Sequence, residues 1–228
     1  QSFLRKGHVM SKLAFIFPGQ GAQKAGMGKD FYENSEAARS FFDNAQEILD
    51  FDLKEMCFGE HEELNLTEYT QPCMVSVCLA IVQELKKRGI NPDITAGLSL
   101  GEYAAVAAAG GMNELDAIKL VRRRGILMQN TVPTGEGAMA AVLGLDAKKI
   151  EEILESFENV WIANYNCPGQ IVITGLTNEV QQASLALKEA GAKRVVELKV
   201  SGPFHSLLLK PAGEALLKEM ESMSFSPL

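Results

Sequence analysis

The sequence predicts an α/β protein, with a main domain built on a parallel sheet and a smaller α+β subdomain inserted into it. Three observations lead to this fold class. An apolar run precedes a glycine-rich loop, a GxSxG pentapeptide joins a second short strand to a helix, and a complete βαββαβ series follows from Gly137. The length of 228 residues suits one large domain that carries a small lobe.

The first elements follow from apolar runs and helix signals. Leu13–Phe17 is continuously apolar and ends before Pro18, which predicts a strand buried on both faces of a sheet. Apolar periodicity predicts a helix over Ser35–Leu49. Another is expected over Pro72–Arg88, because proline suits a first helical turn and Gly89 suits the position after a helix.

A second strand, Ile94–Gly97, leads directly into Ser99. The helix expected over Leu100–Ala109 is rich in alanine and can pack closely, and a further helix is expected over Asn113–Gln129. Apolar positions in a last helix, Leu207–Met223, predict its return to the same core. Residues 10–132 and 202–228 therefore form the expected main domain, and residues 1–9 are expected to be a tag or disordered.

From Gly137 the order of the predicted elements changes. The strands are Ala138–Leu143, Val160–Tyr165, Gln170–Thr174 and Arg194–Val200, and the helices are Ala147–Phe157 and Asn178–Ala190. This βαββαβ order is the ferredoxin-like split motif. We therefore expect residues 133–201 to form a ferredoxin-like inserted subdomain.

Composition excludes several classes of protein. A net charge of -7 is unfavourable for a general nucleic-acid binder, which needs excess Lys and Arg. The four cysteines form no CxxC pair and no zinc-type cluster, so we expect reduced thiols, no metal site and a cytoplasmic protein. The longest apolar run, 74–82, is too short to cross a bilayer, so no membrane partner is expected.

The pentapeptide 97–101 has the context of a nucleophile elbow, because it lies between a strand and a helix. Glycine on both sides leaves space for a tight turn, which would display Ser99 at a helix N-terminus. Free N–H groups and the helix dipole favour an oxyanion there, and the N–H of Leu100 is a natural donor. This context predicts a hydrolase-like main domain. The alternative is a surface turn in which the glycines serve geometry alone.

His205 is the candidate general base. It follows Pro203 and Phe204 in an irregular segment, whereas His8 lies in the expected tag and His61 in an acidic stretch. A serine hydroxyl is too weakly nucleophilic to attack a thioester unaided, and a neutral imidazole is the usual proton acceptor. A capping or core histidine is the alternative.

Arg124 lies at the centre of an apolar helix face. That face comprises Ala117, Leu120, Val121, Leu127 and Met128, whereas Lys119, Arg122 and Arg123 fall outside it and are expected to be solvated. A guanidinium on a buried face needs an anion. Arg124 therefore either pairs with an internal carboxylate or remains available to bind a substrate carboxylate with both arms of its fork.

Taken together, these motifs resemble the malonyl-CoA:acyl carrier protein transacylase family and the acyltransferase domains of fatty-acid and polyketide synthases. The resemblance rests on FPGQGAQ (17–23), TQP (70–72), GLSLGEY (97–103), RGILMQ (124–129), NYNCPGQIVITG (164–175) and GPFHS (202–206). Many members have His where this chain has Leu98. Members also continue past the position of Leu228 with strands and helices that complete the main sheet, so we expect a truncated chain.

The resemblance implies transfer of a malonyl group from malonyl-CoA to the phosphopantetheine thiol of acyl carrier protein, in fatty-acid biosynthesis. It implies Ser99 as the acylated nucleophile, His205 as its base, and backbone N–H groups of Gln20 and Leu100 as the oxyanion hole. Arg124 would bind the malonyl carboxylate. Phe204 and Met128 would line the substrate site, and Phe204 with Leu100 would favour malonyl over methylmalonyl groups.

The implied reaction needs no metal or other cofactor, because the coenzyme A thioester is itself a substrate. An acidic carrier protein would need a local basic patch, for which Lys193, Arg194, Arg122 and Arg123 are candidates. A serine esterase or thioesterase and a non-catalytic acyl-binding module are the alternatives. A patatin-like hydrolase is disfavoured, because the chain contains no Asp-Gly dipeptide.

Overall fold

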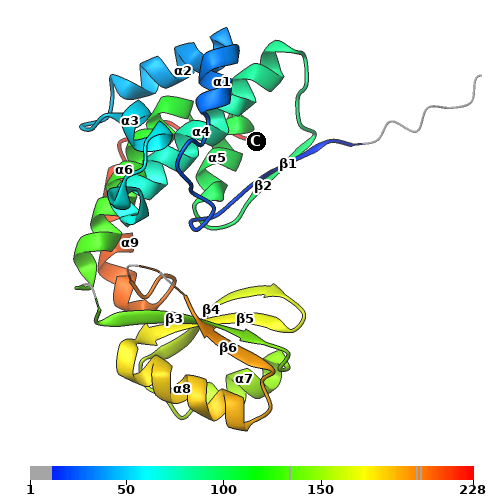
Figure 1. Ribbon diagram of the computed structural model, residues 1–228, viewed down its shortest axis with the longest axis vertical. Coiled ribbons are helices and arrows are strands. Elements are labelled where there is room, and N and C mark those ends of the chain that lie inside the picture. Colours follow the sequence, from blue (N-terminus) through cyan, green and yellow to red (C-terminus); the bar gives the residue numbers. More distant parts are fainter. Residues whose placement is uncertain (1–11, 134, 199, 201) are drawn as a thin grey trace, which may run out of the picture. The chain divides into compact units, whose positions relative to one another are not determined.

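The computed structural model describes residues 12–133, 135–198, 200 and 202–228 as a mixed α/β protein (Figure 1). Residues 1–9, for which a tag or disorder is expected, lie outside the described residues. The chain divides into two compact units. Unit 1 comprises the residues up to His61, Pro72–Val121 and Ser224–Leu228, and unit 2 comprises Glu62–Gln71 and Arg122–Met223.

Unit 1 combines a small parallel sheet with helices. Strands β1 (Ala14–Phe17) and β2 (Ile94–Gly97) pair in parallel, with Phe17 opposite Gly97. The helices of this unit are α1 (Lys29–Asn34), α2 (Glu36–Gln46), α3 (Leu53–Phe58), α5 (Gly101–Ala108), most of α4 (Thr67–Lys87) and the first turns of α6 (Glu114–Thr131). Parallel pairing brings the carboxyl ends of both strands to one edge of the sheet, where the predicted nucleophile follows β2.

The expected burial of the first strand on both faces is wrong for the described residues. Phe17 is buried, but Ile16 is 78% exposed and Ile94 on β2 is 53% exposed. Helix α5 packs against both strands. Helix α5 does not cover Ile16 and Ile94, so these two strands keep an exposed apolar surface.

Short capped helices surround the core of unit 1. Asp52 accepts a hydrogen bond from the Glu55 N–H at 2.9 Å and begins α3, and Ser35 caps α2 in the same way through the Ala38 N–H. The sequence pattern predicts neither α1 nor α3, because helices of one or two turns show little periodicity. Among the described helices, none has the length and apolar character required to cross a membrane.

Unit 2 is built on a four-stranded antiparallel sheet with the strand order β4-β5-β3-β6. Its strands are β3 (Gly137–Leu143), β4 (Val160–Cys167), β5 (Gln170–Leu176) and β6 (Arg194–Glu197). Helices α7 (Ala147–Leu154) and α8 (Thr177–Glu189) lie on one face of this sheet, and their apolar side chains share a buried core with it (Figure 1). Strand β6 ends at Glu197 rather than Val200, because the Val200 N–H bonds back to the Leu198 carbonyl.

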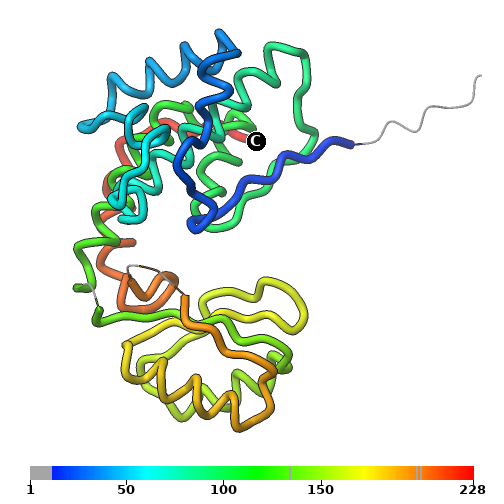
Figure 2. The backbone as a smooth tube through the Cα atoms, in the orientation of Figure 1, coloured from blue at the N-terminus to red at the C-terminus, as the bar shows by residue number. Residues whose placement is uncertain are grey.

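The other face of the sheet carries a second apolar cluster. Met139, Ala141 and Val172 of the strands pack with Phe204, which belongs to the segment that leaves β6. That segment continues through a short 3-10 turn, η2 (Leu207–Leu209), into α9 (Lys210–Met220), and Figure 2 draws it in orange. The segment with the candidate base is therefore anchored to the sheet by Phe204.

Candidate active site

Ser99 occupies a strained turn between β2 and α5. Its φ of 50° lies in the left-handed region, which side chains other than glycine seldom adopt. Of the residues that the structure describes, the other non-glycine residue with positive φ is His205, at 60°. Backbone strain of this kind often occurs at functional sites. The two residues that the sequence nominates for proton transfer and nucleophilic attack thus share an uncommon backbone state.

The Ser99 turn lies directly against the loop that carries Gln20. A β-carbon on Gly101 would lie 2.4 Å from the Phe17 carbonyl oxygen, and one on Gly19 would lie 2.9 Å from that of Leu98. Real β-carbons essentially never approach backbone this closely, so both glycines permit contact between the two segments. The Leu98 N–H also donates to the Phe17 carbonyl at 3.2 Å.

The loop bends immediately after Gln20. Gly21 has a φ of 110°, and its N–H donates to the Gln23 side-chain oxygen at 2.8 Å. Ser99 and Gln20 are both partly exposed, whereas the Leu100 side chain is buried at the N-terminus of α5. Unit 1 therefore brings together three of the predicted site residues: the nucleophile and both candidate oxyanion donors.

In unit 2, a tight turn holds His205. The Ser206 hydroxyl donates to the Pro203 carbonyl at 2.7 Å, and the Phe204 N–H donates to the Gly202 carbonyl at 3.0 Å. The Pro203 ring packs on Gly137, where a β-carbon would lie 2.2 Å from the proline Cδ. These contacts fix the backbone on both sides of the imidazole.

The surroundings of His205 favour its neutral form. The residue has an exposed surface, but enough protein surrounds the ring that loss of hydration lowers its pKa, and the positive charge of Arg124 lowers the pKa further. A neutral imidazole can accept a proton. Arg124 and His205 both belong to unit 2.

Met128 and Phe204 meet in the apolar cluster over the sheet of unit 2. The Met128 sulfur also accepts a hydrogen bond from Gln71 Nε2 at 3.5 Å, and Gln71 is fully buried. Sequence reasoning missed this contact. The sequence carries no local signal for it, because Gln71 precedes the predicted helix 72–88 and joins α4 only through the earlier start of that helix at Thr67. Unit 2 therefore gathers His205, Arg124, Phe204 and Met128, the remaining predicted site residues.

The expectation that Arg122 is solvated is wrong. Its side chain is 11% exposed, and its Nη1 donates to the Glu68 carbonyl at 2.8 Å and to Glu68 Oε2 at 3.0 Å. The helical wheel could not reveal this, because the first turn of α4 covers a face of α6 outside the main apolar stripe. Arg123, by contrast, is half exposed and pairs with Glu219 of α9.

The start of α4 explains the contact with Arg122. This helix begins at Thr67, not at the predicted Pro72, so the proline lies inside the helix. In a regular helix the N–H of residue 72 would donate to the Glu68 carbonyl. Pro72 has no N–H, so this hydrogen bond cannot form. Arg122 supplies the missing donor.

The remaining predictions concern two basic residues and the four cysteines. Lys193 and Arg194, the remaining candidates for carrier docking, are both exposed. The cysteines are free thiols, and in the described part of the chain no group of three His, Cys, Asp or Glu side chains could hold a metal ion.

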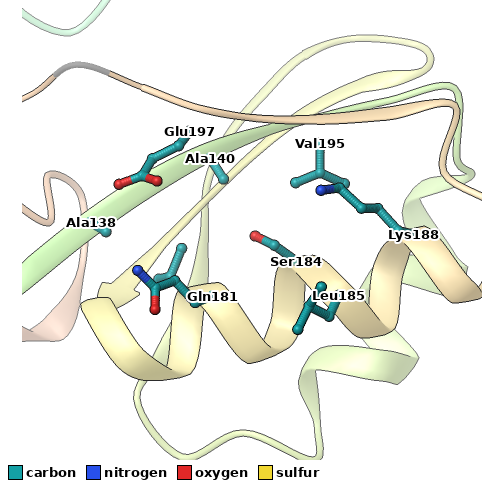
Figure 3. Close-up of a pocket in the computed structure, with 9 residues that line it drawn as sticks. Ala138, Ala140, Gln181, Ser184, Leu185, Lys188, Val195 and Glu197 are labelled. Atoms are coloured by element: carbon teal, nitrogen blue, oxygen red, sulfur yellow. The ribbon is translucent and has the colours of Figure 1, made fainter.

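A separate hollow lies between α8 and the strands β3 and β6 in unit 2. Its volume is about 250 Å³, and its walls are mainly apolar. Lys188 and Glu197 lie at opposite ends of it (Figure 3). None of the predicted site residues lines this hollow.

Comparison with known proteins gives consistent matches. The acyl transferase domain family matches residues 14–227 of the chain. The malonyl CoA-acyl carrier protein transacylase of Bacillus subtilis is 49% identical over 218 residues, which cover 93% of this chain and 69% of that protein. The protein of the same name from Staphylococcus aureus is 48% identical over 206 residues, which cover 88% of this chain and 66% of that protein. The chain thus spans about two thirds of the length of these curated relatives.

Solved structures agree with the sequence matches. A malonyl CoA-acyl carrier protein transacylase from Clostridium perfringens has a TM-score of 0.91 and 43% identity, with 96% of this chain and 70% of that chain covered. A malonyl-transacylase in complex with its type II PKS acyl-carrier protein has a TM-score of 0.91 and 40% identity, with 95% and 72% covered.

Proposed function

The chain belongs to the acyl transferase domain family, and on that premise we propose that it transfers a malonyl group from malonyl-CoA to acyl carrier protein. The reaction is an acyltransferase step of fatty-acid synthesis. The observation that carries the proposal is the strained Ser99 turn, packed against the Gln20 loop at the carboxyl ends of β1 and β2. Malonyl-CoA and acyl carrier protein are the proposed partners, and neither nucleic acid nor a membrane is required.

In the first half-reaction, His205 takes the proton of the Ser99 hydroxyl. The serine oxygen attacks the thioester carbonyl, and the N–H groups of Leu100 and Gln20 stabilise the oxyanion. The carbon–sulfur bond then breaks, and coenzyme A leaves with the proton that His205 had accepted. The product is a malonyl ester on Ser99.

In the second half-reaction, the phosphopantetheine thiol of the carrier protein attacks that ester. His205 takes the thiol proton and returns it to the Ser99 oxygen as the ester bond breaks. The malonyl group leaves as a new thioester. These proton transfers need neither a metal nor another cofactor. The lowered pKa of His205 supports its role, because the base must be neutral when each nucleophile arrives.

Arg124 provides the proposed selectivity for a carboxylated acyl group. Its guanidinium can bind a malonyl carboxylate through two parallel hydrogen bonds. The apolar side chains of Phe204 and Met128 line the acyl site beside it, and Phe204 with Leu100 disfavours a methyl branch. The effect of the Arg124 charge on the pKa of His205 supports a shared site, because the malonyl carboxylate and its thioester carbonyl are separated by one methylene group.

Intact-protein mass spectrometry after incubation with malonyl-CoA tests the proposal. We expect a malonyl adduct on the Ser99 peptide, and no adduct in Ser99→Ala. Arg124→Ala should lose malonyl loading while its uptake of neutral acyl groups becomes relatively better. Unchanged malonyl loading by Arg124→Ala would falsify the carboxylate-binding role.

The same incubation separates this function from its alternatives. Release of free malonate faster than transfer to the carrier would indicate an esterase or thioesterase. Binding of malonyl-CoA without an adduct would indicate a non-catalytic acyl-binding module. Transfer from the Ser99 ester to the carrier thiol supports the acyltransferase.

The proposal also covers the domain boundaries, the type of each domain and the cellular compartment. Residues 10–132 with 202–228 would form a hydrolase-like main domain, and residues 133–201 a ferredoxin-like subdomain. The strand order β4-β5-β3-β6, with α7 and α8 on one face, supports the second assignment. The free cysteines favour a reducing, cytoplasmic environment.

A further inference from the structure

Arg122 of α6 donates to a backbone carbonyl of α4 that has no donor within its own helix. Because Pro72 has no N–H, the Glu68 carbonyl lacks its usual helical partner. Arg122 Nη1 reaches this carbonyl at 2.8 Å and the Glu68 carboxylate at 3.0 Å. Its guanidinium carbon lies 4.9 Å from the centre of the Tyr69 ring. This arginine therefore holds the backbone, side chain and neighbouring ring of one helical turn.

Two further contacts join the same parts of α4 and α6. Gly125 lies so close to α4 that a β-carbon on it would be 2.7 Å from the Glu68 Cα. The Gln129 side-chain oxygen accepts a hydrogen bond from the Thr67 N–H at 3.2 Å. Residues 122, 125 and 129 share one helix face, because a helix turns by about 100° per residue. This face of α6 is the α4 latch, defined by Arg122, Gly125 and Gln129.

Arg124 lies on a different face of α6, and Met128 lies between that face and the latch, where its sulfur accepts a hydrogen bond from Gln71 of α4. Met128 packs into the cluster that contains Phe204, and the charge of Arg124 acts on His205. The latch thus contacts the first turn of α4, and Arg124, the proposed carboxylate-binding group, lies on another face of the same helix. Arg124 is flanked in sequence by Arg122 and Gly125, so the latch determines both its height along the helix axis and its direction around that axis.

We propose that Arg122 is a positioning residue for Arg124, which it holds where the guanidinium can meet the substrate carboxylate. This inference rests on the carboxylate-binding role proposed for Arg124. Arginine suits the task because its guanidinium is planar and always charged, and its Nη1 holds the carbonyl and the carboxylate of Glu68 together. Lysine offers a flexible point charge and should hold the latch less firmly.

The test compares Arg122→Met with Lys119→Met, a matched control that removes an exposed cation of the same helix. Each variant is incubated with malonyl-CoA and with acetyl-CoA, and the rate of Ser99 acylation is measured by mass spectrometry. We expect Arg122→Met to lower kcat/KM for malonyl-CoA about ten- to a hundred-fold, mainly through KM, because small displacements of a binding group have large effects. Acetyl loading should stay close to that of the parent chain, and Lys119→Met should change neither rate.

A merely structural role for Arg122 would lower both loading rates together. Equal losses, or no loss in Arg122→Met, would therefore overturn the proposal. If Arg122→Met does not fold, Arg122→Lys replaces it, with a smaller selective loss expected and the same overturning outcomes. Adding Pro72→Ala to Arg122→Met supplies the N–H that the Glu68 carbonyl lacks. This second change should restore part of the malonyl loading, and failure to restore any would contradict the latch.

A measurement without turnover separates this proposal from the proposed function. The Nε–Hε resonance of Arg124, assigned by its absence in Arg124→Lys, reports the setting of the guanidinium in the full chain. This resonance should shift or broaden in Arg122→Met and stay unchanged in Lys119→Met. A changed resonance in a chain that never loads malonyl would preserve the positioning role and reject the proposed function. An unchanged resonance would reject the positioning role whatever the activity.

Discussion

A β-carbon placed on Gly97 would lie 2.0 Å from the carbonyl carbon of Gly101. The last residue of β2 and the first residue of α5 therefore touch through their backbones. Ser99 lies at the apex of the turn between them, with a φ of 50°. The GxSxG spacing is thus a packing requirement: each outer position must lack a side chain so that the middle one can be displayed.

Gly97→Ala should disrupt this turn. The added methyl group meets backbone that cannot move aside, so we expect a loss of at least about 3 kcal/mol in the free energy of unfolding. Urea unfolding measures the loss. Gly213→Ala in α9 is the matched control, because its β-carbon enters open space and should stabilise the chain by about 0.4–1 kcal/mol. Parent-like stability of Gly97→Ala would refute the packing requirement.

Arg124→Gln should raise the pKa of His205. Removal of the positive charge leaves loss of hydration as the remaining cause, so the pKa should rise but stay below its ordinary value. NMR titration of the imidazole in the free protein measures the change. An unaltered or lower pKa in Arg124→Gln would show that the two side chains do not interact.

His205 should also make stability depend on pH. The folded state binds this proton less tightly than the unfolded chain does, because the folded pKa is lowered. The contribution is therefore present above the ordinary pKa and is lost as pH falls toward the lowered one. Denaturant unfolding across this range, compared with His205→Gln, should show a smaller pH dependence in the variant. Identical curves would argue against a lowered pKa.

Ser206→Ala should slow malonyl loading by loosening the His205 turn. The lost hydrogen bond to the Pro203 carbonyl should cost about 1 kcal/mol of stability. Ser222→Ala is the matched control, because Ser222 donates to the Glu219 carbonyl with the same spacing. It should have a similar effect on stability and leave loading unchanged. Equal loading rates in the two variants would contradict a role for Ser206 in holding the base.

Charge reversal at Lys193 and Arg194 should weaken use of the carrier protein. Both side chains are exposed, and a basic patch would attract an acidic carrier. We expect Lys193→Glu with Arg194→Glu to raise KM for the carrier and spare KM for malonyl-CoA in steady-state assays. Lys148→Glu with Lys218→Glu makes the same charge change at other exposed positions. An equal rise in KM for the carrier in both double variants would indicate an effect of the protein's overall charge rather than of a docking surface at Lys193 and Arg194.

The sequence by itself determined the local elements and the chemistry of the candidate side chains. The predicted βαββαβ order placed the strands of unit 2 to within a few residues, because apolar stretches and the turns between them are local properties of the sequence. The GxSxG pattern located Ser99, because its constraint acts within one turn. The scarcity of histidines nominated His205 as the candidate base.

Tertiary contacts decided the rest, since they join residues that are distant in the sequence. Pro72 reads as the start of a helix until Arg122 is seen to satisfy the Glu68 carbonyl, fifty-four positions away. Arg122 reads as solvated until α4 covers it. Ile16 reads as buried, because an apolar side chain does not specify whether another element will lie against it. The chemistry of a side chain follows from the residue type alone, but the groups that it contacts depend on how the whole chain folds.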